Sequence, residues 1–195
     1  MRTEAGRILV LAAIVWLAAC SSRESALVKS SREPAAAVPK RQPQVSPLRR
    51  KVVSLLEKKN YRQALELLHG KNREGLEKEY VLALSGLLEA GDDAFASGDY
   101  VAAGRSYKLV LNAYPAESVL RDRISHDPKR IRALLDTCVN RMMEQGLEEY
   151  RRGNLESAIV KWKALLAIKP GHKEAKKALD TATVQLQALQ DMKGK

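Results

Sequence analysis

The feature that most constrains the fold is a pattern of residues that recurs after 55 positions. The paired positions are Gly91 and Gly146, Gly98 and Gly153, Ala103 and Ala158, Tyr107 and Trp162, Leu111 and Leu166, and Pro115 and Pro170. A third, weaker copy lies at Asn60-Tyr61-Arg62-Gln63-Ala64-Leu65, where Lys59 replaces the glycine. Repetition at this scale indicates a stack of similar structural units.

The two stronger copies have the residues that two antiparallel helices require. The glycine can take the left-handed backbone that ends one helix, and Asp99 or Asn154 can cap the next. The alanine is small enough for close helix packing, and the proline stops the second helix. Aromatic residues make up only 5% of the chain, which is typical of helices packed on helices. We therefore expect an all-α fold built from antiparallel helix hairpins.

The pattern resembles the tetratricopeptide repeat, which has a small residue in its first helix, a turn glycine, an alanine, an aromatic and a closing proline. The resemblance covers residues 84–117 and 139–172, and residues 48–70 only in part. The family has an aromatic residue three positions after the small residue of the first helix. This chain has Ala94 and Glu149 at that position, and its aromatic residues Phe95 and Tyr150 follow one position later. The resemblance implies a solenoid whose concave face binds a partner protein.

Helix-start signals predict a long first helix in each of the two stronger copies. Asp127 can cap a helix with Pro128 at its first position, so this helix can run to Arg152. A matching helix can run from Glu74 to Ser97, and residues 116–126 would be a connecting loop. We expect a folded domain over 48–192, with hairpins at about 48–70, 74–115 and 128–170 and an amphipathic closing helix over 172–192.

The N-terminus has the features of a targeting segment. Basic residues precede the apolar run Ile8–Leu17, which is too short to be a permanent membrane span. The run ends in Leu17-Ala18-Ala19-Cys20, which resembles the lipobox of bacterial lipoproteins. The resemblance implies that residues 1–19 are a cleaved signal peptide and that Cys20 is acylated, with chains such as palmitate. The alternative is an ordinary signal peptide with an incidental cysteine.

Residue Ser21 bears on the membrane that the chain would reach. In the lipoprotein family an Asp at this place retains the protein in the inner membrane, so Ser21 favours the periplasmic face of the outer membrane. In a Gram-positive host the chain would lie on the outer face of the only membrane. Residues 20–47 hold four prolines and several serines, and we expect a flexible tether. Its basic residues could hold it near anionic head groups, or it could be a merely solvated linker.

The chain is basic, with a formal net charge of +11, or +10 once residues 1–19 are removed. Outside the cytoplasm we expect no nucleic-acid partner, and the available anions are lipid head groups and cell-wall polymers. Two basic segments could bind such anions or could be solvated faces. They comprise Arg121, Arg123, Lys129, Arg130 and Arg132, and Lys161, Lys163, Lys169, Lys173, Lys176 and Lys177.

The sequence holds no recognisable set of catalytic residues. Its three histidines, His69, His126 and His172, lie in separate segments without metal-ligand spacing. Phosphate loops, nucleophile elbows and paired-carboxylate signatures are absent from the sequence. We therefore expect no enzymatic activity, no metal and no cofactor. Cys138 lies on an apolar stripe at helical spacing, which favours a buried structural thiol.

The first helix of each long hairpin supplies the residues of a candidate groove. If the register of the resemblance holds, the groove is lined by Ser85, Leu88, Glu89, Asp92, Phe95, Asn140, Met143, Glu144, Leu147, Tyr150 and Arg151. Apolar anchors mixed with carboxylates suit a bound peptide, although the apolar members could instead pack against neighbouring helices.

These features together predict a membrane-anchored adaptor or assembly factor of the bacterial envelope that binds another envelope protein. The alternative function is a basic-surface protein that binds cell-wall or anionic-lipid polyanions.

Overall fold

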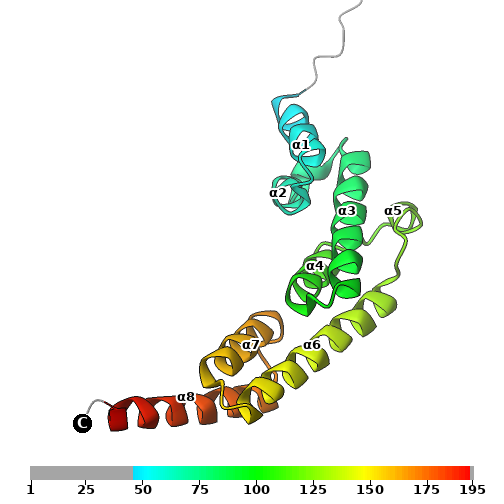
Figure 1. Cartoon of the computed structure of the whole chain (residues 1–195). Helices are drawn as coiled ribbons and strands as arrows, with labels where there is room; N and C mark the ends of the chain where they lie inside the picture. The colour runs from blue at the N-terminus through cyan, green and yellow to red at the C-terminus, as the bar shows by residue number, and fades with distance from the viewer. Residues whose placement is uncertain (1–45, 194–195) are drawn as a thin grey trace, which may run out of the picture. The chain divides into compact units, whose positions relative to one another are not determined.

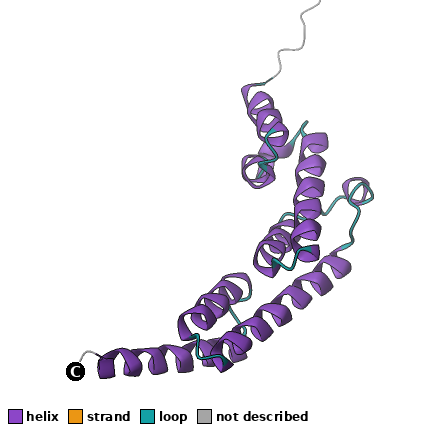
Figure 2. Ribbon diagram, in the orientation of Figure 1, coloured by secondary structure: helices purple, strands orange, loops and turns teal. Residues whose placement is uncertain are grey.

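The computed structural model describes residues 46–193, and every regular element in that range is helical (Figures 1 and 2). The expected all-α class is therefore confirmed. The lipobox and most of the tether lie outside the described residues. Within residues 46–193, none of the helices has the length and apolar character needed to span a membrane.

The first hairpin consists of α1 (Pro47–Glu57) and α2 (Tyr61–Leu67). Lys59 takes the left-handed turn conformation that the other hairpins give to glycine, with a φ of 55°. Asn60 caps α2 by accepting a hydrogen bond from the Gln63 N–H, at 3.4 Å. This copy, which matches the repeat pattern least well, therefore still forms a helix hairpin.

The second hairpin consists of α3 (Glu77–Ala96) and α4 (Tyr100–Asn112). Gly98 has a φ of 81° in the turn, and Asp99 accepts a capping hydrogen bond from the Ala102 N–H at 3.0 Å. The helix starts three residues later than expected from the sequence. Residues Gly70–Arg73 form a 3-10 helix, η1, and Gly75 has a φ of 74°, so the α-helix cannot begin at Glu74.

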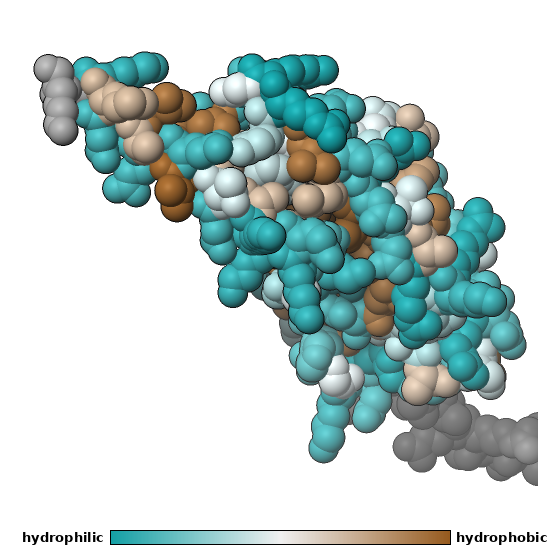
Figure 3. Space-filling view, turned by 90° about the horizontal axis from the view of Figure 1, so that it is seen from below, coloured by the Kyte–Doolittle hydropathy of each residue, from teal (hydrophilic) through white to brown (hydrophobic). Residues whose placement is uncertain are grey.

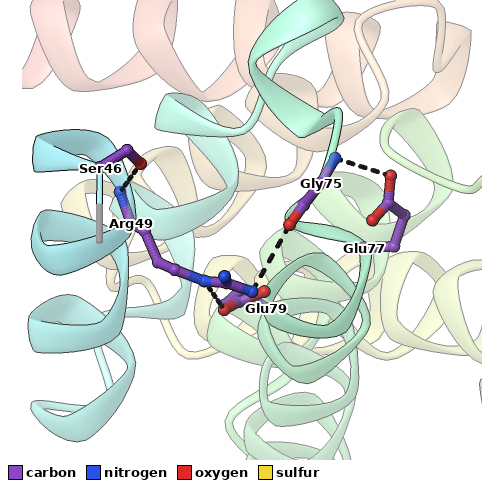
Figure 4. Close-up of polar contacts among 5 residues, drawn as sticks. All are labelled: Ser46, Arg49, Gly75, Glu77 and Glu79. Carbon is purple, nitrogen blue, oxygen red and sulfur yellow. Dashed lines mark hydrogen bonds and ion pairs between the residues drawn. The ribbon is translucent and has the colours of Figure 1, made fainter. Parts of the chain in front are cut away.

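Polar contacts hold the start of α3 against α1 (Figure 4). Arg49 Nε lies 2.7 Å from Glu79 Oε1, and Glu77 Oε1 accepts a hydrogen bond from the Gly75 N–H at 2.9 Å. The hydrogen bond from Arg49 holds the pKa of Glu79 below its ordinary value. Arg49 Nη2 also donates to the Gly75 carbonyl at 3.5 Å, so the left-handed turn at Gly75 is held through both its N–H and its carbonyl.

The third hairpin consists of α6 (Pro128–Arg151) and α7 (Leu155–Ile168), and α8 (Lys173–Lys193) follows it. The long helix expected to start at Pro128 is confirmed. Asp127 Oδ1 accepts hydrogen bonds from the N–H groups of Lys129 and Arg130, at 2.8 and 2.9 Å. These bonds lower the pKa of Asp127 and satisfy the first free donors of α6.

The segment expected to be a plain connecting loop, residues 116–126, contains the short helix α5 (Ser118–Arg121). The expectation missed the spacing of Leu120 and Ile124, which are four residues apart and both buried. His126 is buried as well. This connection is therefore packed against the hairpins instead of being solvated.

The helices pack around two groups of buried residues. One core lies among the four helices α1, α2, α3 and α4 and the first half of α6, which contributes Ile131 and Cys138. The other joins the second half of α6, including Met142, to α7 and α8. In both long hairpins the helix glycine lies against the aromatic of the second helix, Gly91 against Tyr107 and Gly146 against Trp162. Ala103 and Ala158 are fully buried, as their place in the repeat predicts.

Candidate functional site

The eleven residues of the predicted groove lie on α3 and α6 and differ in accessibility. Leu88 is only 1% exposed and belongs to the core, so it offers no surface to a partner, contrary to expectation. Glu89, Asn140, Glu144 and Arg151 are exposed. The remaining six, Ser85, Asp92, Phe95, Met143, Leu147 and Tyr150, are half-buried.

The two aromatic residues of the predicted groove each pack within their own hairpin. Phe95 makes an edge-to-face contact with Tyr100, with ring centroids 5.6 Å apart. Tyr150 lies against Trp162, with centroids 5.9 Å apart. Both rings also border the cores. Their main contacts are therefore within the fold, which favours the packing alternative for these two residues.

Asp92 holds three parts of the fold together. The Tyr107 hydroxyl donates a hydrogen bond to Asp92 Oδ1 at 2.7 Å, and His126 Nε2 lies 3.2 Å from Oδ2. Burial and the bond to Asp92 raise the pKa of Tyr107 well above its ordinary value. The Tyr114 hydroxyl donates to the His126 carbonyl at 3.0 Å. One carboxylate oxygen of Asp92 thus contacts α4 and the other contacts His126 before α6, so Asp92 links α3 to both segments.

A cavity in the described part of the chain lies elsewhere, beside α2. Helix α2 has 7 residues, whereas α4 has 13 and α7 has 14. The missing two turns leave the end of α4 and the start of α3 uncovered. The resulting pocket has a volume of about 530 Å³. It is lined by Arg62, Leu65, Glu66, Leu68, His69, Gly70, Arg73, Tyr80, Leu109, Asn112, Ala113, Tyr114 and Ala116.

The pocket, which we call the α2 pocket, is mainly apolar with a polar rim. Arg73 lies over the ring of Tyr80, 4.9 Å from its centroid, and pairs with Glu117. The Tyr80 hydroxyl donates to the Ala113 carbonyl, which closes one side of the pocket. Arg62 pairs with Glu66 at 3.1 Å. Apolar walls with a few fixed polar groups suit an apolar side chain that carries a polar neighbour.

Sequence reasoning missed this pocket, although one signal for it exists. By the 39-residue offset between Asn60 and Asp99, Gly70 takes the place of Leu109 in the next copy. A glycine there ends the helix early, and Gly70 has a φ of 63°. The glycine that ends α2 early is therefore the sequence signal for the α2 pocket.

A smaller hollow of about 270 Å³ lies where α6, α7 and α8 meet. It includes Leu147 and Tyr150 of the predicted groove, together with Trp162 and four residues of α8, Glu174, Lys177, Ala178 and Thr181. The two halves of the predicted groove therefore differ: Leu147 and Tyr150 border a hollow, whereas their counterparts Asp92 and Phe95 are engaged in packing and polar contacts.

Potential metal ligands are scattered. Residues 46–193 contain no group of three or more His, Cys, Asp or Glu side chains placed to hold a metal ion. Cys138 is buried, and burial raises the pKa of its thiol to about 11. Its position agrees with the structural role expected from the apolar stripe.

Comparison with known proteins gives no family for this chain. No protein-family model matches it, and neither a curated protein nor a solved structure is detectably similar to it. The function is therefore argued from the pocket and the surface alone.

Proposed function

We propose that this chain is a membrane-anchored adaptor of the bacterial envelope, and that the α2 pocket binds a segment of a partner protein. The single observation that carries the proposal is the apolar pocket of about 530 Å³ left by the short α2. In a stack of helix hairpins an uncovered layer is the natural place for a segment from another chain. The tetratricopeptide-like repeat supports the proposal, because its glycine and aromatic positions are in contact in both long hairpins.

The pocket chemistry defines the kind of segment. Leu65, Leu68 and Leu109 offer apolar walls, so an aliphatic or aromatic side chain of the partner would fill the space. Arg62, His69 and Asn112 at the rim would contact polar groups of the same segment. The exposed groove residues Glu89, Asn140, Glu144 and Arg151 stay a prediction as a second contact surface.

Membrane attachment is the other half of the proposal and rests on the lipobox ending at Cys20. A Cys20→Ser variant should lose acyl labelling and either stay uncleaved or become soluble. Unchanged labelling and membrane retention in this variant would remove the lipoprotein part of the proposal and leave the pocket part standing.

Pocket binding is tested by crosslinking in cells that express the full chain. A photo-crosslinking residue at the exposed position Ala116, on the pocket, should capture a defined partner band, and the same residue at exposed Ala133, on α6, should not. A tryptophan at Ala116 should block the pocket, whereas Ala133→Trp is the matched control. Equal capture from both positions would contradict the pocket as the site.

The alternative is that the basic surface binds polyanions. Lys163, Lys173 and Lys176 are exposed, and none has an ion pair within residues 46–193. Capture of polyanions by this surface should weaken steeply with salt, because exposed charges are screened beyond about 8 Å at physiological ionic strength. Capture in the α2 pocket should persist in moderate salt and be lost in Ala116→Trp.

A further inference from the structure

Helix α8 is longer than the helix on which it packs. It has 21 residues and α7 has 14, so α8 is about 10 Å longer at 1.5 Å per residue. Ala175 and Ala182 are buried against the third hairpin, and Leu186 is half-buried there. Residues 187–193 are all exposed. Figure 1 shows the end of α8 running on past α7.

The exposed end of α8 has an unusual composition. No charged residue occurs from Thr181 to Gln190, although 29% of the whole chain is charged. Three large apolar side chains are exposed there, Val184, Leu189 and Met192, of which Val184 points away from the third hairpin while Leu189 lies on the same side of α8 as Ala182. Figure 3 shows hydrophobic side chains gathered beside the C-terminal end. Loss of charge with exposed apolar groups is the compositional mark of an interface core.

One face of this segment has the spacing of a helix-pairing seam. The seam residues alternate at spacings of four and three and are all exposed: Lys177, Thr181, Val184, Ala188 and Asp191. At 100° per residue Val184, Ala188 and Asp191 lie on the side of α8 away from buried Ala182, whereas Lys177 and Thr181 also border the hollow between α6, α7 and α8. Spacing of four and three is what two helices need to pack side by side along their length.

The charges at the two ends of the seam determine which partner fits. Lys177 and Asp191 lie seven residues before and seven after Val184. In an antiparallel pair of identical helices centred on Val184, each Lys177 meets the partner's Asp191. In a parallel pair, Lys177 would meet Lys177 and Asp191 would meet Asp191. Charge complementarity therefore selects a second copy of this chain in antiparallel order.

We propose that α8 is a self-association helix and that two copies pair antiparallel along the seam, with the two Val184 side chains at the symmetry axis. The contact is short, because the uncharged stretch covers only three helical turns. Its area is below that of a standard stable interface, so the dimer forms reversibly and gains from confinement of both copies to one membrane. This proposal is independent of the α2 pocket.

Cysteine crosslinking in the full-length chain tests the pairing. Antiparallel order brings the two Val184 positions within disulfide reach, so Val184→Cys should give at least about fivefold more dimer than a control. The matched control is Val160→Cys on α7, because Val160 is 63% exposed and Val184 is 70% exposed. Cys20 and Cys138 are present in both variants, so their contribution cancels. Equal dimer yields from the two variants would overturn the proposal.

Mixed variants test the direction of the pairing. In the antiparallel pair, Thr181 of one copy lies about level with Ala188 of the other. The two Thr181 residues are about 9 Å apart along the helix axis, and the two Ala188 residues are about 12 Å apart. Differently tagged Thr181→Cys and Ala188→Cys chains should therefore crosslink to each other and not to themselves. Strong self-crosslinking of each variant would overturn the antiparallel order.

Charge reversal separates a specific pair from chance collision. Lys177→Asp should lower the Val184→Cys dimer yield about fivefold, because it sets two acidic pairs against each other. Adding Asp191→Lys should restore the yield, since both pairs become opposite in charge again. Failure of the double variant to recover would overturn the proposed pairing. Ala116→Trp, in the α2 pocket, should leave the yield unchanged.

Discussion

The indole ring of Trp162 lies against the backbone of Gly146 so closely that a Cβ at Gly146 would overlap the indole. The same relationship occurs one hairpin earlier, where a Cβ at Gly91 would come 3.0 Å from Tyr107 Cε1. Each glycine thus gives the aromatic ring of the second helix room to pack against the first. The recurrence of this contact explains why a glycine and an aromatic residue stand at the same separation in both copies.

Gly146→Ala should destabilise the domain by about 1 to 3 kcal/mol, because Trp162 must move out of a well-packed place. Thermal melting measures the loss. Gly171→Ala is the matched control, since a Cβ there meets nothing within 4 Å. Equal melting temperatures for the two variants would show that Trp162 can move at no cost.

Tyr107→Phe should destabilise the fold by about 1 kcal/mol, because it removes the hydrogen bond that the buried Tyr107 hydroxyl donates to half-buried Asp92. The comparison is Tyr100→Phe, which removes a hydroxyl that has no hydrogen bond to another described side chain. Denaturant unfolding of both variants measures the difference. If Tyr100→Phe costs as much, the bond between Tyr107 and Asp92 contributes nothing of its own.

The stability of the domain should fall as the pH rises from about 9 to about 11, in part because of Cys138. Burial raises the pKa of this thiol from 9.0 to about 11, so the unfolded chain loses the proton first and is favoured at high pH. Below pH 9 this effect is absent. Unfolding measured at pH 8 and pH 10.5 should show a smaller decline for Cys138→Ala than for the natural chain, and an identical decline would contradict the burial.

Phe95→Ala and Tyr150→Ala should both lower the melting temperature, because each ring packs on an aromatic of its own hairpin. We expect a loss of roughly 2 to 3 kcal/mol, below the 3 to 5 kcal/mol of a fully buried aromatic, because both rings are only half-buried. Partner crosslinking in the same variants completes the measurement. Near-native melting with loss of the partner would instead place a binding site at these residues.

The sequence predicts the helices well where local chemistry decides them. The Asp127-Pro128 start and the turn glycines Gly98 and Gly153 fix the boundaries of the long hairpins by capping and by backbone conformation, which are properties of a few neighbouring residues. The buried state of Ala103 and Ala158 also follows from the repeat.

The sequence predicts the sites less well, because accessibility depends on which elements pack together. The burial of Leu88 and the engagement of Asp92 by His126 depend on residues from other helices and on the packed connection 116–126. The α2 pocket exists because α2 is shorter than the second helices of the other hairpins. The repeat pattern is too weak in this copy for the sequence to show that the helix ends early. A groove inferred from register alone therefore does not show which of its side chains are accessible, as the burial of Leu88 illustrates.

Helix α6 belongs to both cores: its first half supplies Ile131 and Cys138 to one, and its second half supplies Met142 to the other. The two cores therefore cannot open independently, because loss of either one exposes half of a continuous helix and breaks the cooperativity of its hydrogen-bond ladder. In native-state hydrogen exchange the amides in the middle of α6 should open only with global unfolding, while those of α1 and of the last turns of α8 exchange by local fraying. This single helix makes the three hairpins one folding unit.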